Sequence, residues 1–533
     1  MTYTRLVLLS TLKIWNVLFG TLKQEKIIHA KIKHVLLAYI CGMPPKFAMH
    51  KVFTFLFLIS FSRLTAQIYP KEGSKLNYRI VGFSFPVLPA TGNYTIQIAN
   101  GNQTTQSGFK KNILKSVNAD KNKIIIEVPT FGTDYSWRVI DNQHNTLFAD
   151  SIHHFSTSTS RNVNSDFRIT VLENSGKYNN DYVFMDGTCV LYDMLGQPVW
   201  FLPETEYINP ASAPASDLKL TPQGTITFLT AFNIYEVNYN GDILWQGSKK
   251  GVVSGDSTEN FNHEFTRLAN GHYMAAGNEI VTLKESNSIT HFGDIIEYDP
   301  LGAIVWSWRS SPFFLKQSGI DYDHPPKDYL DVHLNAFYFD EKERMVYVSF
   351  KNISVILKVK YPEGNVVNVY GNIPTGGVKP ANDLFCGQHS CRSSANGDLY
   401  LYNNNTCHPG SMPTVLMMKQ PVNKSGSLEK VWEYTCNISD TLPQKQSDEL
   451  HPVSYSFPKG GNVIELPDRS LFVNMCGAFG KSFIITLNRK IEWSARLESW
   501  NEQKKDWEGV NNYRASIITS RKDLERLIWN SEK

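Results

Sequence analysis

"IIEYDPLGAIVW", residues 295–306, decides the fold because its pattern returns along the chain. It consists of an apolar strand, a turn that contains Gly, and a second strand that ends in Trp. The copies recur at intervals of roughly 60 residues, after a first interval of about 45, and such a period is typical of a repeat architecture. The aromatic residues that end the copies are Trp200, Trp245, Trp306, Tyr370, Trp432 and Trp493.

A second phrase, a turn followed by an alternating strand, precedes most of these copies. Each repeat therefore has room for four strands, and units that cannot bury their faces alone stack around an axis as β-propeller blades. We predict a six-bladed β-propeller over residues 165–533, with five or seven blades as the alternatives because the first repeat is short. The strand in NNYRASII (511–518) could close the ring against the first blade. The copies of the second phrase are LTPQGTITFL (220–229), LANGHYMAA (268–276), SSANGDLYLY (393–402) and LPDRSLFVN (466–474).

The part of the chain that precedes the repeats predicts a second all-β unit. GNYTIQIANG (92–101), NKIIIEVPT (122–130) and GTDYSWRVID (132–141) are short alternating strands separated by turn residues. We predict a β-sandwich over residues 68–158, similar to fibronectin type III domains in its YSWRV strand. The polar segment STSTSRNVNSD (156–166) is expected to be a linker.

The composition agrees with an all-β protein and excludes two classes of function. The chain has 533 residues, of which 42% are hydrophobic and 12% aromatic, so it can bury a large core in more than one domain. Its net charge of +3, from 53 basic and 50 acidic residues, lacks the strongly basic character of nucleic-acid-binding or polybasic membrane-binding proteins.

A secretory signal lies inside the N-terminal region. MHKVFTFLFLISFSRLTAQIYP (49–70) has a short basic start, an apolar run and small residues before Gln67, where we expect cleavage. We therefore predict that residues 49–67 are a signal peptide and that residues 1–48 are an upstream extension that is not translated. The alternatives are a membrane anchor in LVLLSTLKIWNVLFG (6–20), which polar residues interrupt, and a weak lipoprotein signal at LLAYICGM (36–43).

Six cysteines remain after such a leader is removed, and an even number in an exported chain favours disulfides. A Cys/His metal site is the alternative, because Cys386 and Cys391 flank His389 and Cys407 precedes His408. We favour disulfides because the C-x4-C spacing is loose for structural zinc and no second C-x2-C pair exists. The six are Cys189, Cys386, Cys391, Cys407, Cys436 and Cys476.

Three histidines precede the second strand of three consecutive repeats. They are His263, His333 and His389, and equivalent positions in a propeller lie at similar radius and height. We therefore expect the three side chains to converge on the axis. In DVHLNAFYFDEKERMVYVSFKNISVILKVKY (331–361), which we interpret as two strands and a turn, period-two geometry points Asn335 to the same face as His333.

The motifs around these histidines resemble the bacterial arylsulfate sulfotransferase family. They are NHEF (262–265), the H-x-N pair followed by DEKERMVYVSFKN (340–352), QH (388–389) with NGDLYLYNN (396–404), and a final YRA (513–515). The resemblance covers about residues 68 to 520. It implies an exported enzyme with an N-terminal β-sandwich and a six-bladed propeller, which moves a sulfuryl group between phenols through a sulfated histidine without a nucleotide donor or another cofactor.

The resemblance also implies residue roles. The sulfated histidine falls on His389, and the two other central histidines fall on His263 and His333. The family's asparagine falls on Asn335, and its arginine falls on Lys351, where this chain departs from the pattern. A substrate-binding hydroxyl falls in HPVSYSF, as Ser454 or Ser456.

The expected partners are a small phenolic sulfate donor and a phenol acceptor, in the periplasm or outside the cell. We expect no nucleic-acid partner and no stable membrane insertion after signal cleavage, and a homodimer is compatible with the sequence. Two alternatives stay open: a metal-dependent hydrolase or lyase built on the three histidines, and a binding propeller without catalysis. Metal analysis and an activity screen with aryl sulfates distinguish them.

Overall fold

The computed structural model divides the chain into two compact units, one of residues 1–68 and 85–89 and one of residues 69–84 and 90–533. The predicted leader (1–67) lies outside the described residues. Among the residues that the structure describes, no helix is both long and apolar enough to span a membrane. The described ranges are 68–86, 93–143, 146–147, 151–164, 166–205, 215–230, 233–247, 253, 260–284, 286–322, 324, 329–371, 373, 384–408, 411–422, 427–437, 460–476 and 480–531.

The N-terminal β-sandwich has a large and a small sheet. In the large sheet the strand order is β1-β8-β6-β3-β4, with β7 paired to β6, and β2 and β5 form the small sheet. Trp137 lies in its core with an edge-to-face contact to Phe83, at a ring-centroid distance of 5.1 Å. The elements are β1 (Ser74–Leu76), β2 (Ile80–Ser84), β3 (Tyr94–Asn100), α4 (Gln106–Lys111), β4 (Ile113–Ala119), β5 (Lys123–Glu127), β6 (Asp134–Asp141), β7 (Thr146–Leu147) and β8 (His153–Thr157).

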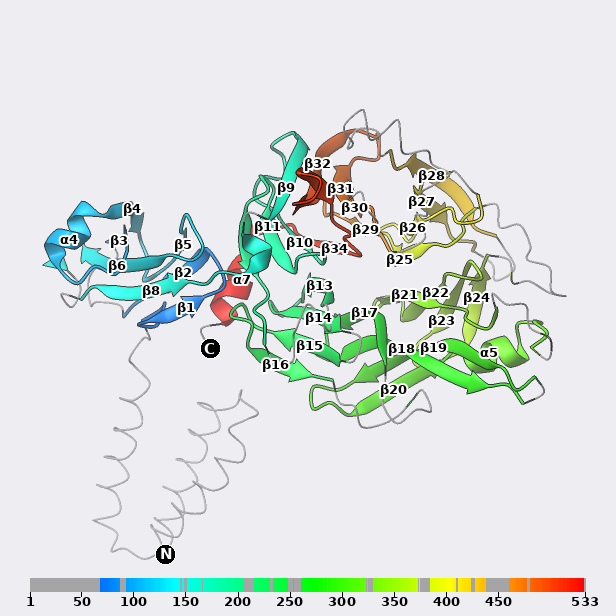
Figure 1. Ribbon diagram of the computed structural model, residues 1–533. Helices are drawn as coiled ribbons and strands as arrows, with labels where there is room; N and C mark the ends of the chain where they lie inside the picture. The colour runs from blue at the N-terminus through cyan, green and yellow to red at the C-terminus, as the bar shows by residue number, and fades with distance from the viewer. Residues whose placement is uncertain are drawn as a thin grey trace, which may run out of the picture. The chain divides into compact units, whose positions relative to one another are not determined.

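Six sheets follow as the blades of a propeller (Figure 1); five have four strands, and the sixth has four blade strands plus β9 and β33. Neighbouring blades share hydrophobic cores; one such core joins β18 and β19 of the third blade to β22 and β23 of the fourth. From inner to outer strand, the first three blades are β34 (Ala515–Ile518), β10 (Tyr182–Met185), β11 (Val190–Asp193) and β12 (Pro198–Phe201); β13 (Ser216–Leu220), β14 (Ile226–Thr230), β15 (Asn233–Val237) and β16 (Ile243–Gln246); and β17 (Phe261–Arg267), β18 (Tyr273–Thr282), β19 (Ile289–Tyr298) and β20 (Ile304–Arg309).

The remaining blades repeat this order, and short helices interrupt the chain. The fourth to sixth blades are β21 (Leu334–Asp340), β22 (Met345–Phe350), β23 (Val355–Lys360) and β24 (Val366–Tyr370); β25 (His389–Ser393), β26 (Leu399–Asn403), β27 (Thr414–Lys419) and β28 (Glu429–Thr435); and β29 (Asn462–Glu465), β30 (Leu471–Asn474), β31 (Lys481–Ile485) and β32 (Ile491–Asn501). The other elements are η2 (Arg161–Val163), β9 (Phe167–Asn174), α5 (Ser311–Lys316), β33 (Asp506–Gly509) and α7 (Arg521–Asn530).

Both ends of the repeat region close the ring, and the predicted six blades are confirmed. The C-terminal strand β34 pairs with β10 and becomes the inner strand of the first blade, as the NNYRASII stretch predicted. The first strand, β9, pairs instead with β32 at the outer edge of the sixth blade. The closure therefore joins residues near 180 to residues near 516, so the first blade forms only when the end of the chain is in place.

Four of the repeated Trp residues join a blade to the next by a hydrogen bond. Trp200 in β12 donates its indole N–H to the carbonyl of Tyr239, in the outer turn of the second blade, at 2.7 Å. Trp306 and Trp432 donate likewise to Pro362 and Leu487, each one blade further along. Trp493 of the sixth blade donates to Met194 of the first, at 2.9 Å. In these four blades the repeat therefore encodes an inter-blade hydrogen bond, and at Trp200 and Trp493 it also encodes a buried ring.

Two local predictions were wrong. Residues 331–361 form three strands, because Lys351–Ser354 makes a second turn in which Ser354 has a left-handed φ of 53°. The segment predicted as a linker includes Ser156 and Thr157, which belong to β8, and η2 follows at Arg161–Val163.

Candidate active site

Three imidazole rings lie together at the inner strands of the third, fourth and fifth blades. The ring of His263 lies 5.1 Å from that of His333 and 5.9 Å from that of His389, between ring centroids. His263 belongs to β17, His333 precedes β21, and His389 begins β25. The convergence expected from the repeat is present in the structure.

A bulge in each inner strand directs these side chains. The pairing register shifts between Phe261 and Phe265, between Leu334 and Ala336, and between His389 and Arg392. β-bulges interrupt the alternation of a strand and re-aim side chains, often beside active sites. The argument that His333 and Asn335 point to the same face because they are two residues apart therefore fails. Asn335 lies within the bulge, where the alternation of side chains is interrupted.

Residues with left-handed backbone conformation lie at the bulges, and their positions show that the three histidines do not share an identical register. His263 and His333 have φ values of 61° and 56°, whereas in the fifth blade it is Ser390, one residue after His389, that has a φ of 53°. Non-glycine residues adopt this region at a cost of about 1–3 kcal/mol, and they persist where the surrounding structure enforces it. The three histidines are thus equivalent only to within one residue.

The hairpin of β21 and β22 explains the eighteen-residue offset of Lys351 from His333. Leu334 pairs with Phe350, so the residues that flank this pair lie opposite each other. The backbone N–H of Lys351 accordingly donates to the carbonyl of His333, at 2.9 Å. On its other side, His333 Nδ1 lies 3.5 Å from a carboxylate oxygen of Asp331.

Asn335 is fully buried and links the fourth blade to the residue before His389. Its Nδ2 donates to the carbonyl oxygen of Gln388 at 2.7 Å. Gln388 in turn donates through Nε2 to Ser349 and to two backbone carbonyls of the same blade. These contacts hold the backbone of His389 against the neighbouring blade.

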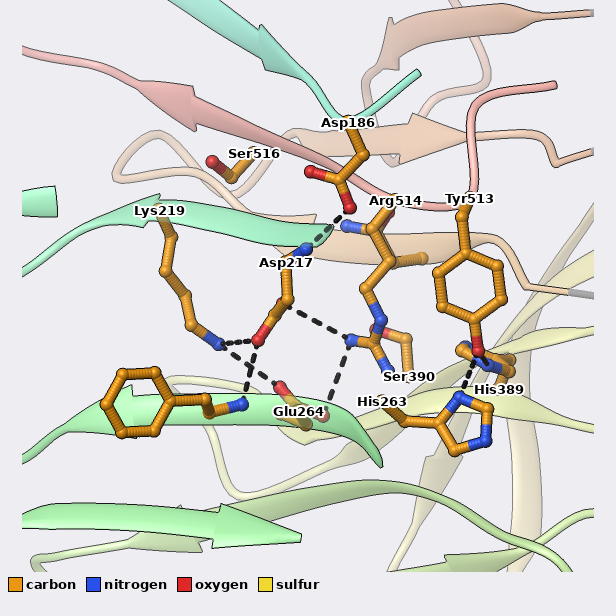
Figure 2. Close-up of polar contacts among 12 residues, drawn as sticks. Asp186, Asp217, Lys219, His263, Glu264, His389, Ser390, Tyr513, Arg514 and Ser516 are labelled. Carbon is orange, nitrogen blue, oxygen red and sulfur yellow. Dashed lines mark hydrogen bonds and ion pairs between the residues drawn. The ribbon is translucent and has the colours of Figure 1, made fainter. Parts of the chain in front are cut away.

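Tyr513, which follows the sixth blade and precedes β34, contacts two of the histidines. Its hydroxyl lies 2.8 Å from His389 Nε2 and is also hydrogen-bonded to His263 Nδ1 (Figure 2). The other ring nitrogens, His389 Nδ1 and His263 Nε2, are enclosed and have no hydrogen-bond partner among the described residues. Desolvation raises the pKa of Tyr513 above its usual range, so the phenol keeps its proton at neutral pH.

Two of the histidines, His389 and His263, are kept neutral by their surroundings. Desolvation lowers the pKa of His389 well below 6.5, and the positive charges of Arg514 and Lys351 act in the same direction. The pKa of His263 is also well below 6.5, through desolvation and then the neighbouring His333, Arg514 and Lys351. A neutral imidazole can act as a nucleophile or a base, whereas imidazolium cannot.

A cluster of buried charges lies beside the histidines (Figure 2). Arg514 has ion pairs with Glu264 at 3.4 Å and Asp217 at 3.8 Å. Lys219 pairs with Asp217 at 2.7 Å, and Arg392 binds Glu264. Three cations thus face Asp217 and Glu264, and a third carboxyl group, Asp186, adjoins them with a pKa that burial raises to about 7, so positive charge is in excess and suits an anionic substrate.

Comparison of the sequence with models of known families identifies the family of the chain. The sequence model of the arylsulfotransferase (ASST) family matches residues 168–437. The chain belongs to the arylsulfotransferase family. Membership supports aryl sulfotransferase activity in general and phenolic compounds as substrates.

Comparisons with individual proteins add no further assignment. No curated protein matches the sequence. Among solved structures, a protein of unknown function from Bacteroides caccae is 12% identical, with 67% of this chain and 100% of that chain covered and a TM-score of 0.38. Apo AztD from Citrobacter koseri is 6% identical, with 80% and 98% covered and a TM-score of 0.30.

The charge cluster and burial shift the pKa values of Glu264 and Asp186 in opposite directions. Burial raises the pKa of Glu264, but Arg392, Arg514 and Lys219 outweigh it and hold that pKa below its usual range. Burial raises the pKa of Asp186 to about 7, although its carboxylate accepts the backbone N–H groups of Asp217 and Leu218. Beside Asp217, the cluster therefore contains Glu264, which stays ionised, and Asp186, which is partly protonated near neutral pH.

One disulfide lies beside the site. Cys386, three residues before His389, is bonded to Cys407 with Cα atoms 5.9 Å apart. The prediction of disulfides is confirmed for this pair, while the other four cysteines that the structure describes are free and buried. In the described part of the chain, the one group close enough to share a metal ion is Cys386, Cys407 and His408, and its two sulfurs are already bonded to each other.

Sequence reasoning missed several residues of the cluster. The YRA motif contained Tyr513 and Arg514, and the sequence predicted that this strand closes the ring, but no pattern indicated that their side chains contact the histidines and the charge cluster. The predicted hydroxyl residues Ser454 and Ser456 lie outside the described residues. The residues that were missed are Asp186, Asp217, Lys219, Arg392, Tyr513 and Arg514.

Proposed function

We propose that the protein transfers a sulfuryl group from a phenolic sulfate ester to a phenolic acceptor, with His389 as the covalent carrier. The observation that supports this most strongly is the meeting of three imidazoles, of which His263 and His389 have depressed pKa values, beside a net-positive cluster in a chain of the arylsulfotransferase family. The resemblance of the QH motif to the family supports His389 as the carrier, and the contacts of Asn335 and Gln388 hold its backbone in place.

In the first half-reaction, a ring nitrogen of His389 attacks the sulfur of the donor ester. The nitrogen–sulfur bond forms, the bond from sulfur to the aryl oxygen breaks, and the phenolate leaves with the electron pair. Because sulfuryl transfer, like phosphoryl transfer, depends on positioning and charge stabilisation, His263, His333 and Lys351 are assigned to the sulfuryl oxygens and the leaving oxygen. Asn335 and a hydroxyl of Ser454 or Ser456 are proposed to bind substrate.

In the second half-reaction, the acceptor phenol attacks the sulfur on His389. The proton of the phenol passes to a neighbouring base, the nitrogen–sulfur bond breaks, the new ester leaves, and neutral His389 is restored. Donor and acceptor thus occupy the same site in turn, which predicts ping-pong kinetics. Lys351 supplies a point charge where the family has the planar fork of arginine, so it can neutralise one oxygen but does not bind two in a bidentate way.

An acceptor-dependent assay tests the proposal. The purified protein is mixed with 4-nitrophenyl sulfate and phenol without any nucleotide, and phenyl sulfate is detected by mass spectrometry. We expect phenyl sulfate and 4-nitrophenol in equal amounts, and neither from the His389→Asn variant. Release of 4-nitrophenol and inorganic sulfate without transfer would indicate a hydrolase instead, and an inactive wild-type protein would point to a binding propeller.

We also propose that the chain is exported and that residues 49–67 are removed on the way. The disulfide between Cys386 and Cys407 supports this, because such bonds persist in oxidising compartments. Expression of the gene from Met49 should give the same secreted protein as the longer form, with its N-terminus near Gln67. Loss of secretion from the shorter gene would contradict the assignment.

A further inference from the structure

The proposed function leaves Tyr513 without a role, although its hydroxyl touches two of the three histidines. The contact to His389 Nε2 is 2.8 Å long, and a second hydrogen bond joins the hydroxyl to His263 Nδ1. The rings of His389 and Tyr513 are nearly perpendicular, at 88°, with centroids 5.4 Å apart. The side chain of Tyr513 is partly buried.

A hydroxyl has a single proton, and this couples the two histidines. Tyr513 can donate to one imidazole nitrogen only, so the other imidazole must donate to the tyrosine oxygen. If Tyr513 donates to His263 Nδ1, then His389 holds its proton on Nε2 and has a lone pair on Nδ1. His263 then holds its own proton on Nε2.

The two enclosed nitrogens are the atoms at the two ends of the hydrogen-bonded series His389–Tyr513–His263. His389 Nδ1 and His263 Nε2 are the ring atoms that have no partner among the described residues. Buried polar atoms are usually satisfied, and exceptions are often catalytic or await a ligand. One end is a nucleophilic lone pair, and the other is an N–H group that can donate to a leaving oxygen.

We propose that Tyr513 is a catalytic residue that relays one proton from His389 to His263 during sulfuryl transfer. This inference rests on the proposed function. Desolvation raises the pKa of Tyr513 and keeps the phenol protonated, so it can pass a proton on without remaining ionised. The depressed pKa values of His263 and His389 keep both rings neutral, with one proton each.

The step balances in atoms and charge. His389 Nδ1 forms its bond to sulfur, and the bond from sulfur to the aryl oxygen breaks. The Nε2 proton of His389 moves to the Tyr513 oxygen, the Tyr513 proton moves to His263 Nδ1, and the His263 Nε2 proton moves to the leaving phenolate. After the step, the imidazole rings of His389 and His263 and the phenol of Tyr513 carry no additional charge.

The relay also prepares the second half-reaction. After the first step His263 holds its proton on Nδ1, so its Nε2 lone pair can accept the proton of the acceptor phenol. The protons then return along the same path as the acceptor attacks sulfur, and His389 regains its Nε2 proton. One residue, His263, is therefore the acid in one half and the base in the other.

The dependence on the leaving group tests the relay. Single-turnover release of phenol is measured for Tyr513→Phe and wild type with aryl sulfates whose phenols range from acidic (4-nitrophenol) to basic (phenol, 4-methoxyphenol). Since general acid catalysis matters most for a basic leaving group, we expect the loss in the variant to grow from about 10-fold for 4-nitrophenyl sulfate to roughly 10²–10⁴-fold for phenyl sulfate. Tyr235→Phe, a buried tyrosine of β15 stacked on Phe228, is the matched control and should lose nothing.

The outcomes separate the relay from the function. Equal losses across the series would reduce Tyr513 to a positioning residue, and an unchanged rate would remove it from the mechanism. Sulfation of His389 on Nε2, determined by NMR of the labelled peptide, would also overturn the relay. If wild type releases phenol from none of the esters, the proposed function itself fails. Should Tyr513→Phe not fold, wild type in H2O/D2O mixtures decides: a curved rate plot supports several protons in flight, and a linear one contradicts the relay.

Discussion

Glu264→Gln should destabilise the propeller and weaken the site together. The carboxylate is 2% exposed and lies 3.4 Å from Arg514 and 3.6 Å from Lys219, and it binds Arg392. Removing its charge leaves Asp217 as the carboxylate that is ion-paired to Lys219 and Arg514 and removes the ion pair of Arg392. Breaking a buried ion pair on one side costs about 3–5 kcal/mol, and the lower end applies because glutamine keeps one acceptor oxygen. For a large domain about 3 kcal/mol corresponds to a melting temperature lower by roughly 6 °C.

The acid dependence of stability gives a second readout for the same variant. The folded-state pKa of Glu264 is lower than its unfolded value of 4.5, so its contribution is complete above that pH and is lost as the pH falls below it. The wild-type protein should therefore lose stability in acid more steeply than Glu264→Gln does.

The assay is thermal unfolding by circular dichroism between pH 3 and pH 8. The control is Glu508→Gln, which removes a carboxylate from an exposed pair with Lys504 and should leave the melting temperature unchanged. A Glu264→Gln protein that melts with wild type at neutral pH, and with the same acid slope, would refute the assignment of Glu264 as the anion that holds the cluster.

Three further predictions follow from the same contacts. Lys351→Ala should lower turnover by roughly 10²–10³-fold while Lys351→Arg retains it, as steady-state rates will show, and an alanine variant at full activity would make Lys351 a bystander. Because Lys351 helps to depress the pKa of His389, Lys351→Ala should move the acid limb of the single-turnover rate to higher pH, and an unmoved limb would contradict this. Trp493→Phe, which removes the buried bond to Met194, should cost about 1–3 kcal/mol in urea unfolding, and the half-buried Trp306→Phe should cost less; equal costs would argue against Trp493 as a special closure contact.

The repeat could be predicted from the sequence because the Trp side chain makes the same inter-blade contact in several blades. Its indole must reach the outer turn of the next blade, so it recurs at the same point of each unit, as Trp200 and Trp493 show. The strand count of residues 331–361 was wrong because the second turn contains no Gly or Pro; Ser354 takes the left-handed position instead. A sequence pattern does not reveal a turn when the surrounding structure holds a non-glycine residue in the left-handed conformation.

The candidate site was predictable only in part for a similar reason. His263 and His333 were visible as a repeat position, but the bulges that direct them are set by pairing and have no sequence signature. Tyr513 and Arg514 reach the histidines because β34 completes the first blade, a contact between distant parts of the chain. Long-range closure of this kind leaves no periodic pattern in the residues that it brings together.

Covalent labelling of His389 tests the central proposal most directly. Protein mixed with an aryl sulfate in the absence of acceptor should release a burst of phenol close to one per chain, and the peptide CGQHSCR (386–392) should gain one sulfuryl mass that is lost in acid and survives mild base. His263→Asn and His333→Asn should slow the burst but leave the label on His389, and His389→Asn should show neither. A label on any other residue, or normal turnover without a covalent adduct, would contradict the role of His389 as the carrier.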